Sequence, residues 1–199
     1  SAIHSVAADN RAGGRMAVEH LLSLGYRRIA TIAGRATVGT AVDRLRGYVE
    51  ALAHAGIVPQ AEWVVASDYT EPGGYRAMES LLAVRPRCEA VFCANDLMAI
   101  GALRAAREAG LRVPDDVAIV GFDDVPIARM VDPPLTTIRQ PITLLGATAA
   151  YVLIDMLEQA EARAPHERNQ VLPVELVVRG SCGAGPTSDP SGVKRKEVN

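Results

Sequence analysis

The chain has 199 residues, of which 49% are hydrophobic and 4% aromatic, with a formal net charge of −2 at pH 7. It can therefore bury the core of one domain or of two small ones, and its slightly acidic balance argues against unaided binding to nucleic acid. No apolar run is long enough to cross a bilayer, and no secretory signal is visible, so no membrane partner is expected.

Cysteine and histidine are few and scattered. Cys88, Cys93 and Cys182 form no C-x-x-C motif, which favours a reducing cytosol over a disulfide framework. The four histidines have no metal-ligand spacing, so the sequence predicts no metal site.

Helical and strand-like patterns alternate from the N-terminus onward. Helices are expected over 11–25, 41–56, 73–84 and 96–110, and strands over 27–34, 63–67, 89–94 and 117–122. Strict alternation with short loops predicts an α/β fold with a doubly wound parallel sheet. In the helix over 41–56, one face carries Leu45, Tyr48, Val49 and Leu52 and is expected to be buried.

The pattern changes after residue 132. The segment 132–141 contains three prolines and is expected to be an extended crossover. A long helix is expected over 142–158 and a strand over 169–181. The Gly/Pro/Ser-rich segment from 182 to 199 is predicted to be a disordered tail.

Polar residues follow the predicted strands at Gly34–Arg35, Ser67–Tyr69, Asn95–Asp96 and Asp123–Asp124. In doubly wound sheets, ligands bind beyond the carboxyl ends of the strands. The paired aspartates are the most conspicuous, because they end an uncharged run, Ala118–Phe122. Either of them could cap the next helix or bind a ligand.

Four segments carry a family resemblance. They are "DNRAGGRMAVEHLLSLGYRRIATIAG", "RLRGYVEALAHAGI", "AVFCANDLMAIGALRAAREAGLRVPDDVAIVGFDD" and "PPLTTIRQP". In this order and spacing they resemble the lactose-repressor (LacI) family of bacterial transcription regulators, in register from about Val6 to Ser181. The resemblance implies a periplasmic-binding-protein-like domain of two lobes, of which this chain is mainly the C-terminal lobe.

The resemblance also implies boundaries. Residues 1–8 would end the N-terminal lobe and cross over, 9–138 would form the C-terminal lobe, and 139–165 would be a crossover followed by an N-terminal-lobe helix. Residues 166–181 would return as a strand to the C-terminal lobe. The helix-turn-helix headpiece and most of the N-terminal lobe would be absent, so DNA would be bound only through that missing headpiece.

The family pattern implies an effector pocket. Its ligand-binding candidates in this sequence are Asp123, Arg44, Asn95, Tyr69, Thr40 and Gln140. A carboxylate can accept hydrogen bonds from two vicinal sugar hydroxyls, and a guanidinium can donate two hydrogen bonds to hydroxyls or to a carboxylate. We assign Asp123 to the ligand and Asp124 to helix capping.

For two of these candidates the structural alternative has nearly equal weight. Asn95 can bind the ligand or cap the helix that starts after it, and Asp96 can share the two roles. Tyr69 can pack its ring against a sugar or base, or lie in a surface turn. Thr40 and Gln140 are the weaker candidates.

The resemblance further places Ile100, Met130 and Val131 at a dimer interface. Ile100 lies on the helix over 96–110, where Leu97 and Leu103 are expected to serve the core, and it could be a core residue too. Met130 and Val131 precede a proline-rich turn and are harder to bury locally, which favours the interface.

The sequence thus predicts the effector-binding and dimerisation core of a cytoplasmic transcription regulator, with a small molecule such as a sugar as effector and a second copy as partner. The alternative is a periplasmic sugar-binding protein of a transport system. An enzyme is not expected: no G-x-G-x-x-G follows the first strand, no catalytic pair of nucleophile and base is evident, and no cofactor is predicted.

Overall fold

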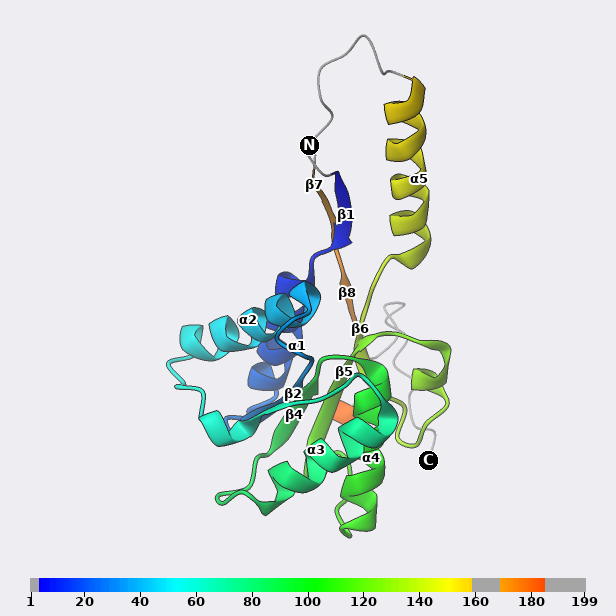
Figure 1. Ribbon diagram of the computed structural model, residues 1–199. Helices are drawn as coiled ribbons and strands as arrows, with labels where there is room; N and C mark the ends of the chain where they lie inside the picture. The colour runs from blue at the N-terminus through cyan, green and yellow to red at the C-terminus, as the bar shows by residue number, and fades with distance from the viewer. Residues whose placement is uncertain (1–3, 159–168, 185–199) are drawn as a thin grey trace, which may run out of the picture.

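The computed structural model describes residues 4–158 and 169–184 (Figure 1). Its strands, in chain order, are β1 (Ser5–Ala8), β2 (Ile29–Ala33), β3 (Val64–Ala66), β4 (Ala90–Cys93), β5 (Ala118–Asp123), β6 (Thr136–Arg139), β7 (Asn169–Leu172) and β8 (Glu175–Val177). Its α-helices are α1 (Asn10–Ser23), α2 (Gly39–His54), α3 (Glu71–Ala83), α4 (Asp96–Glu108) and α5 (Ile142–Glu158). Short 3₁₀ helices lie at Ala61–Trp63, Pro126–Arg129 and Gly180–Cys182.

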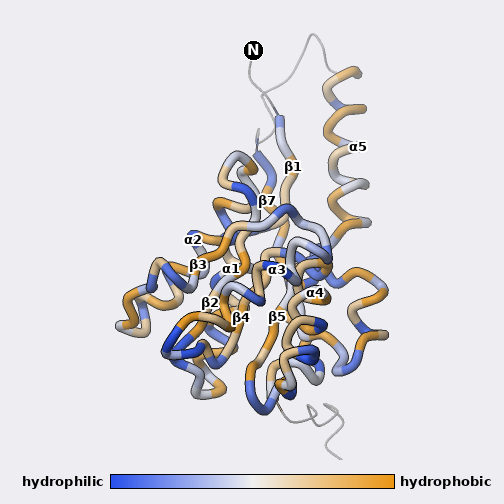
Figure 2. The backbone as a smooth tube through the Cα atoms, turned by 60° about the horizontal axis from the view of Figure 1, so that its bottom comes forward, coloured by the Kyte–Doolittle hydropathy of each residue, from blue (hydrophilic) through white to orange (hydrophobic). Residues whose placement is uncertain are grey.

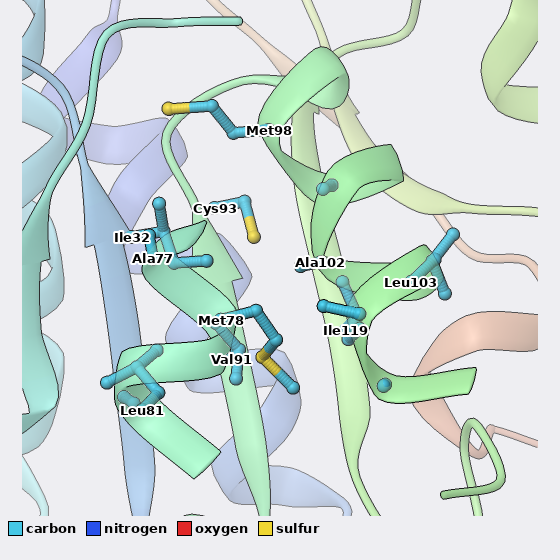
Figure 3. Close-up of a cluster of buried hydrophobic side chains, with 14 of the residues drawn as sticks. Ile32, Ala77, Met78, Leu81, Val91, Cys93, Met98, Ala102, Leu103 and Ile119 are labelled. Carbon is cyan, nitrogen blue, oxygen red and sulfur yellow. The ribbon is translucent and has the colours of Figure 1, made fainter. Parts of the chain in front are cut away.

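The main sheet has the strand order β3-β2-β4-β5-β6-β8, in which β8 alone is antiparallel to its neighbour. Helices cover both of its faces: α1 packs on α2, and α3 packs on α4. One apolar cluster lies on the α3 and α4 side (Figure 3), and a second, around Tyr48 and Phe122, lies on the α1 and α2 side. Burial on both faces explains why β4 and the first five residues of β5, Ala118–Phe122, are uninterrupted runs without polar side chains. The predicted doubly wound sheet is confirmed.

Side chains fix the first turns of three helices. Asp9 accepts the backbone N–H of Ala12 at the start of α1, and Thr70 accepts that of Gly73 at the start of α3. Asn95 does the same for Met98 at the start of α4. Each of these polar side chains satisfies an otherwise unpaired N–H, so each helix begins at a defined residue beside a strand end.

Helices α1 and α2 approach each other closely because glycine lies at both contact points. A Cβ at Gly14 would overlap the carbonyl of Arg44, and a Cβ at Gly47 would overlap the carbonyl of Arg11. This contact sets the position of the α2 backbone that carries Arg44. Of the predicted buried face of α2, Tyr48 and Leu52 are buried and Leu45 is partly buried, but Val49 is 41% exposed, so the prediction for Val49 is wrong.

A smaller unit lies beyond one end of the main sheet. There β1 pairs in parallel with β7, and α5 lies alongside β1 (Figure 1). Apolar residues dominate α5 (Figure 2), yet most of its large ones are exposed: Ile142, Leu144, Tyr151, Leu153, Ile154, Met156 and Leu157. The chain passes between the two parts at three places: after β1, after β6 and between β7 and β8.

The C-terminal third corrects the sequence-based interpretation in three respects. The single strand predicted over 169–181 is two strands, because Pro173 separates β7 in the small sheet from β8 in the main one. The extended segment 132–141 contains β6, which joins the main sheet. Cys182, placed in the predicted tail, is fully buried against the α1 and α2 side of the core. The remaining tail residues, 185–199, lie outside the described residues, and no described helix has the length and apolarity to span a bilayer.

Candidate functional site

All six ligand-binding candidates line one cavity of about 540 Å³. Thr40 and Arg44 come from α2, whereas the other four stand at or just after the carboxyl ends of strands: Tyr69, Asn95, Asp123 and Gln140. The wall is completed by Asp124, Val125, Pro126 and Ile142, the last from the start of α5. The structure therefore brings together all six ligand-binding residues that the family pattern implied, at the edge where parallel sheets bind ligands.

Arg44 forms the floor of the cavity. Its Nε donates to Oδ1 of Asn10 at 2.8 Å, its Nη1 donates to the carbonyl of Ala94, and its guanidinium lies 3.7 Å from the centroid of the Phe122 ring. Nη1 is also 3.3 Å from Oδ1 of Asp123. Burial lowers the pKa of Arg44, and the Asp123 carboxylate opposes that shift, so the buried cation has its counter-ion within the cavity.

Asp123 is the acceptor of the cavity. Its Oδ1 accepts a hydrogen bond from Nε2 of Gln140 at 2.7 Å, in addition to the contact with Arg44. Burial raises the pKa of Asp123, against the stabilising effect of Arg44 and Gln140 on its charged form. In the described part of the chain, both contacts fall on Oδ1, so Oδ2 remains to accept hydroxyl groups of a ligand.

Asn95 acts as the helix cap that was one of its two predicted roles. Its Oδ1 accepts from the backbone N–H of Met98 at 2.9 Å, and its Nδ2 donates to the carbonyl of Tyr69 at 3.0 Å. Asn95 nevertheless lines the cavity, and the second N–H of its Nδ2 can donate to a ligand. Asp96 is fully buried and does not line the cavity. Its Oδ1 accepts a hydrogen bond from Thr137 and its Oδ2 accepts one from the backbone N–H of Val125, so it does not share the ligand-binding role.

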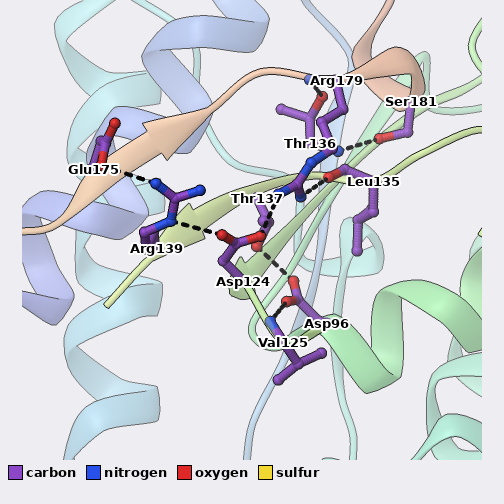
Figure 4. A network of polar contacts seen from close by, with 10 residues as sticks. All are labelled: Asp96, Asp124, Val125, Leu135, Thr136, Thr137, Arg139, Glu175, Arg179 and Ser181. Atoms are coloured by element: carbon purple, nitrogen blue, oxygen red, sulfur yellow. Dashed lines mark hydrogen bonds and ion pairs between the residues drawn. The ribbon is translucent and has the colours of Figure 1, made fainter. Parts of the chain in front are cut away.

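Asp124 is not the helix cap that we predicted. The 3₁₀ helix that follows it, Pro126–Arg129, has no side-chain cap. Instead, Oδ2 of Asp124 accepts from Nε of Arg139 at 2.7 Å, and Oδ1 accepts from Nη2 of Arg179 at 2.6 Å (Figure 4). Burial disfavours its charge, but the hydrogen bonds from these two arginines prevail and lower the pKa of Asp124. Sequence spacing could not reveal this, since Arg179 is 55 residues away.

Tyr69 is partly buried and packs against the α3 and α4 side of the core, so it is more than a surface turn residue. Its φ of 68° places it in the left-handed region, which turns the chain from β3 toward the cavity. Its hydroxyl lies beneath Gly34, where a Cβ would overlap it, and has no hydrogen-bond partner in the described residues.

The three interface candidates lie outside the cavity. Met130 is 79% exposed, and Ile100 is partly exposed on α4. Val131 is partly buried against the α3 and α4 side of the core. Of the two predicted core residues on α4, Leu103 is buried, but Leu97 is 44% exposed, so the prediction for Leu97 is wrong. The helix turns Leu97 outward, because Met98 and Ala102 occupy its inner face.

Sequence reasoning missed several residues of the site. Asn10 accepts a hydrogen bond from Nε of Arg44, but nothing in the sequence relates the two residues, because they are 34 positions apart and Asn10 is the first residue of a helix. Val125, Pro126 and Ile142 supply apolar wall; the position of Val125 and Pro126 directly after Asp123 and Asp124 could have drawn attention to them. A second cavity, of about 430 Å³, lies at the edge of the sheet and contains Arg35, Ser67 and Asp68, which the strand-end pattern had also indicated.

Comparison with known proteins agrees with this geometry. The sequence profile of the periplasmic binding protein-like domain matches residues 18–182. The chain is 42% identical over 177 residues to the HTH-type transcriptional repressor PurR of Erwinia tasmaniensis, which covers 89% of the chain and 51% of that protein. It thus spans about half the length of the curated relatives it matches.

Two solved structures are also similar. The transcriptional regulator CelR–cellobiose complex aligns with a TM-score of 0.86 and 42% identity over 90% of this chain and 54% of that one. A regulatory protein of the LacI family from Chloroflexus aggregans aligns with a TM-score of 0.84 and 37% identity over 90% of this chain and 63% of that one. The chain belongs to the LacI family of transcription regulators, and its residues 18–182 match the periplasmic binding protein-like domain.

Proposed function

We propose that this chain is the effector-binding and dimerisation core of a cytoplasmic transcription regulator, and that the cavity around Asp123 and Arg44 binds the effector. The observation that carries the proposal is the convergence of six polar or aromatic residues from five segments on one cavity. Their groups are donors and acceptors that bind a molecule, with no pairing of nucleophile and base among them, so the proposed role is binding and not catalysis.

The chemistry of the cavity favours a neutral, hydroxyl-rich effector such as a sugar. The charges of Arg44 and Asp123 compensate each other, and Asp124 is neutralised by two arginines, so no unpaired cation is present among the lining residues to attract an anion. Oδ2 of Asp123 can accept from a ligand hydroxyl. The ring of Tyr69 and the side chains of Val125 and Pro126 offer apolar surface to the C–H face of a sugar. Cellobiose, the ligand of the similar CelR complex, is the first candidate to test.

The part formed by β1, β7 and α5 would belong to a second lobe. We propose that residues 1–8 end that lobe and cross over, that 9–138 form the C-terminal lobe, that 139–165 are a crossover followed by a helix of the second lobe, and that 166–181 return as a strand to the C-terminal lobe. The exposed apolar residues of α5 support this, because a helix that is apolar on several sides needs burial on several sides. The described cavity would then be one wall of a cleft between two lobes.

A ligand that closes such a cleft can shift a dimer between two states only if it binds one of them better. The DNA partner would be reached through a headpiece of the longer protein, as in relatives named HTH-type regulators. Ile100, Met130 and Val131 would contribute to the dimer interface. The transport alternative is not favoured, because the relatives reported above are transcription regulators.

A thermal-shift screen tests the proposed function. The chain would be heated with a panel of mono- and disaccharides that includes cellobiose, alongside the variants Asp123→Ala and Asp116→Ala. Asp116 is the matched control, because its side chain is about as exposed as that of Asp123 (30% against 27%) and it binds an arginine outside the cavity. We expect a sugar to stabilise wild type and Asp116→Ala but not Asp123→Ala. Equal stabilisation of all three would contradict the proposal.

A further inference from the structure

Asp123 and Asp124 have an unusual backbone. Their φ angles are 117° and 57°, so two consecutive residues with side chains lie at positive φ. Aspartate tolerates the left-handed region better than most residues, but φ of 117° lies beyond it. Such a conformation persists only where the surroundings hold it in place.

The residues that hold this turn do not themselves line the cavity. The side chain of Asp124 is 10% exposed and is bound by Arg139 of β6 and by Arg179, which follows β8. The next residue, Val125, is held in turn, because its N–H donates to Oδ2 of Asp96 at 2.9 Å. The turn is therefore fixed by side chains from three other segments (Figure 4).

Arg179 is a rigid anchor. Its Nη1 donates to the carbonyl of Leu135 at 2.7 Å, and its backbone N–H donates to Oγ1 of Thr136 at 2.8 Å. Arg139 is bound on its other side by Glu175 of β8 at 3.4 Å. Both arginines thus tie Asp124 to the edge of the main sheet, where β6 and β8 pair.

The two aspartates pair with two consecutive residues of the neighbouring segment. Asp123 lies opposite Arg139 in the register of β5 and β6, Asp124 binds the side chain of Arg139, and Asp123 binds the side chain of Gln140. β6 ends at Arg139, so Gln140 lies where the chain has just left the sheet toward α5. A displacement of Asp124 would therefore move the Asp123 carboxylate relative to both Gln140 and Arg44.

We propose that Asp124 is a positioning residue: held by Arg179 and Arg139, it fixes the Asp123 carboxylate in the orientation that binds Gln140 and the effector. The effector part of this inference rests on the proposed function. Asp124 also lines the cavity, but each of its carboxylate oxygens accepts a hydrogen bond from an arginine, so its proposed role is to hold the turn. An uncharged residue at this place would leave two arginines without their shared partner and the turn without its anchor.

The test reads the Asp123–Gln140 hydrogen bond directly and needs no ligand. In ¹⁵N NMR spectra, the side-chain amide signals of Gln140 report whether Nε2 is bound, and an Asp123→Asn spectrum gives the reference for the altered contact. In Asp124→Asn we expect these signals to leave the wild-type position, whereas Asp116→Asn, a carboxylate that binds an arginine elsewhere, leaves them unchanged. Arg179→Lys keeps the positive charge but loses the planar guanidinium that binds two partners at once, so we expect a smaller displacement of the Gln140 signals.

The inference is overturned if the Gln140 signals stay at the wild-type position in Asp124→Asn or, should that variant not fold, in Arg179→Lys. A titration with cellobiose and with any sugar that stabilises wild type adds the effector readout, where a Kd weaker by about tenfold is expected for Asp124→Asn, the cost of one lost hydrogen bond. An unchanged Kd in a folded Asp124→Asn also overturns the effector part. If wild type binds no sugar while the Gln140 signals move, the positioning role stands and the proposed function fails.

Discussion

The guanidinium carbon of Arg44 lies over the ring of Phe122, 3.7 Å from its centroid, while Nη1 of the same group is 3.3 Å from the carboxylate of Asp123. Phe122 and Asp123 are consecutive in β5, so one strand end supplies both the apolar support and the counter-ion of this buried cation. An arginine suits the position because its planar group can stack and donate in several directions at once.

Replacement of Arg44 by lysine tests this arrangement. A lysine cannot reach Asn10, Ala94 and Asp123 together, so we expect Arg44→Lys to lose about 2 kcal/mol in free energy of unfolding. Urea denaturation measures the loss. Arg46→Lys is the control, since Arg46 is exposed on the same helix and pairs only with Asp43 among the described residues. Equal losses in both variants would show that the buried contacts contribute nothing.

The glycine contact between α1 and α2 gives a second prediction. A Cβ at Gly14 would overlap the backbone of Arg44, so Gly14→Ala must separate the helices. We expect destabilisation of about 2 kcal/mol, typical of overpacking in a well-packed core, together with weaker effector binding. Gly39→Ala serves as the control, because nothing lies within 4 Å of a Cβ there. Thermal unfolding of both variants decides the point, and a Gly14→Ala protein as stable as Gly39→Ala would refute it.

The buried carboxyl of Asp96 predicts a pH dependence of stability. Burial, opposed by the hydrogen bonds from Thr137 and Val125, raises the pKa of Asp96 to about 7. Between pH 4 and 7 the unfolded chain has lost this proton and the folded protein retains it, so stability falls as pH rises through this window and levels off above it. The fall attributable to Asp96 is about 4 kcal/mol, from 1.36 kcal/mol per unit of pKa shift.

The variant Asp96→Asn removes this titration. Its free energy of unfolding, measured with urea at pH 5 and pH 8, should differ less between the two pH values than that of wild type. A difference as large as in wild type would mean that other groups cause the dependence. Asp116→Asn, whose carboxyl is held in its charged form by Arg112, should retain the wild-type fall over this range.

Association of two chains is tested at Met130. Because its side chain is 79% exposed, Met130→Glu should leave stability within about 0.5 kcal/mol of wild type yet weaken a dimer. Sedimentation equilibrium measures the association. Val58→Glu, at an equally exposed residue in another segment, should leave it unchanged. Association that is equally strong in wild type and Met130→Glu would remove this residue from the proposed interface.

Much of the fold follows from short-range patterns. The alternating segments predict the parallel sheet because each buried strand and each amphipathic helix has its own periodicity. The place of Pro173 and the burial of Cys182 were missed, since both depend on pairing with segments far away in the sequence. Asp124 shows the same limit: its two arginines approach from β6 and from the segment after β8, and no local pattern relates them to it.

The six site residues were identified through the family pattern and not from their chemistry. Each has a plausible structural role when considered alone, and for Asn95 that role is real, since it caps α4 while it lines the cavity. The polar residues that follow the predicted strands did indicate the correct edge of the sheet, because ligands bind beyond the carboxyl ends of parallel strands.

The central claim is that the effector binds at Asp123 and Arg44, and NMR mapping of the bound site tests it most directly. Amide signals of the chain would be followed during titration with the sugar that gives the largest thermal shift. We predict that the largest changes fall on Tyr69, Asn95, Asp123 and Gln140. Changes centred on the second cavity, at Arg35, Ser67 and Arg76, with the first four signals unmoved, would contradict it.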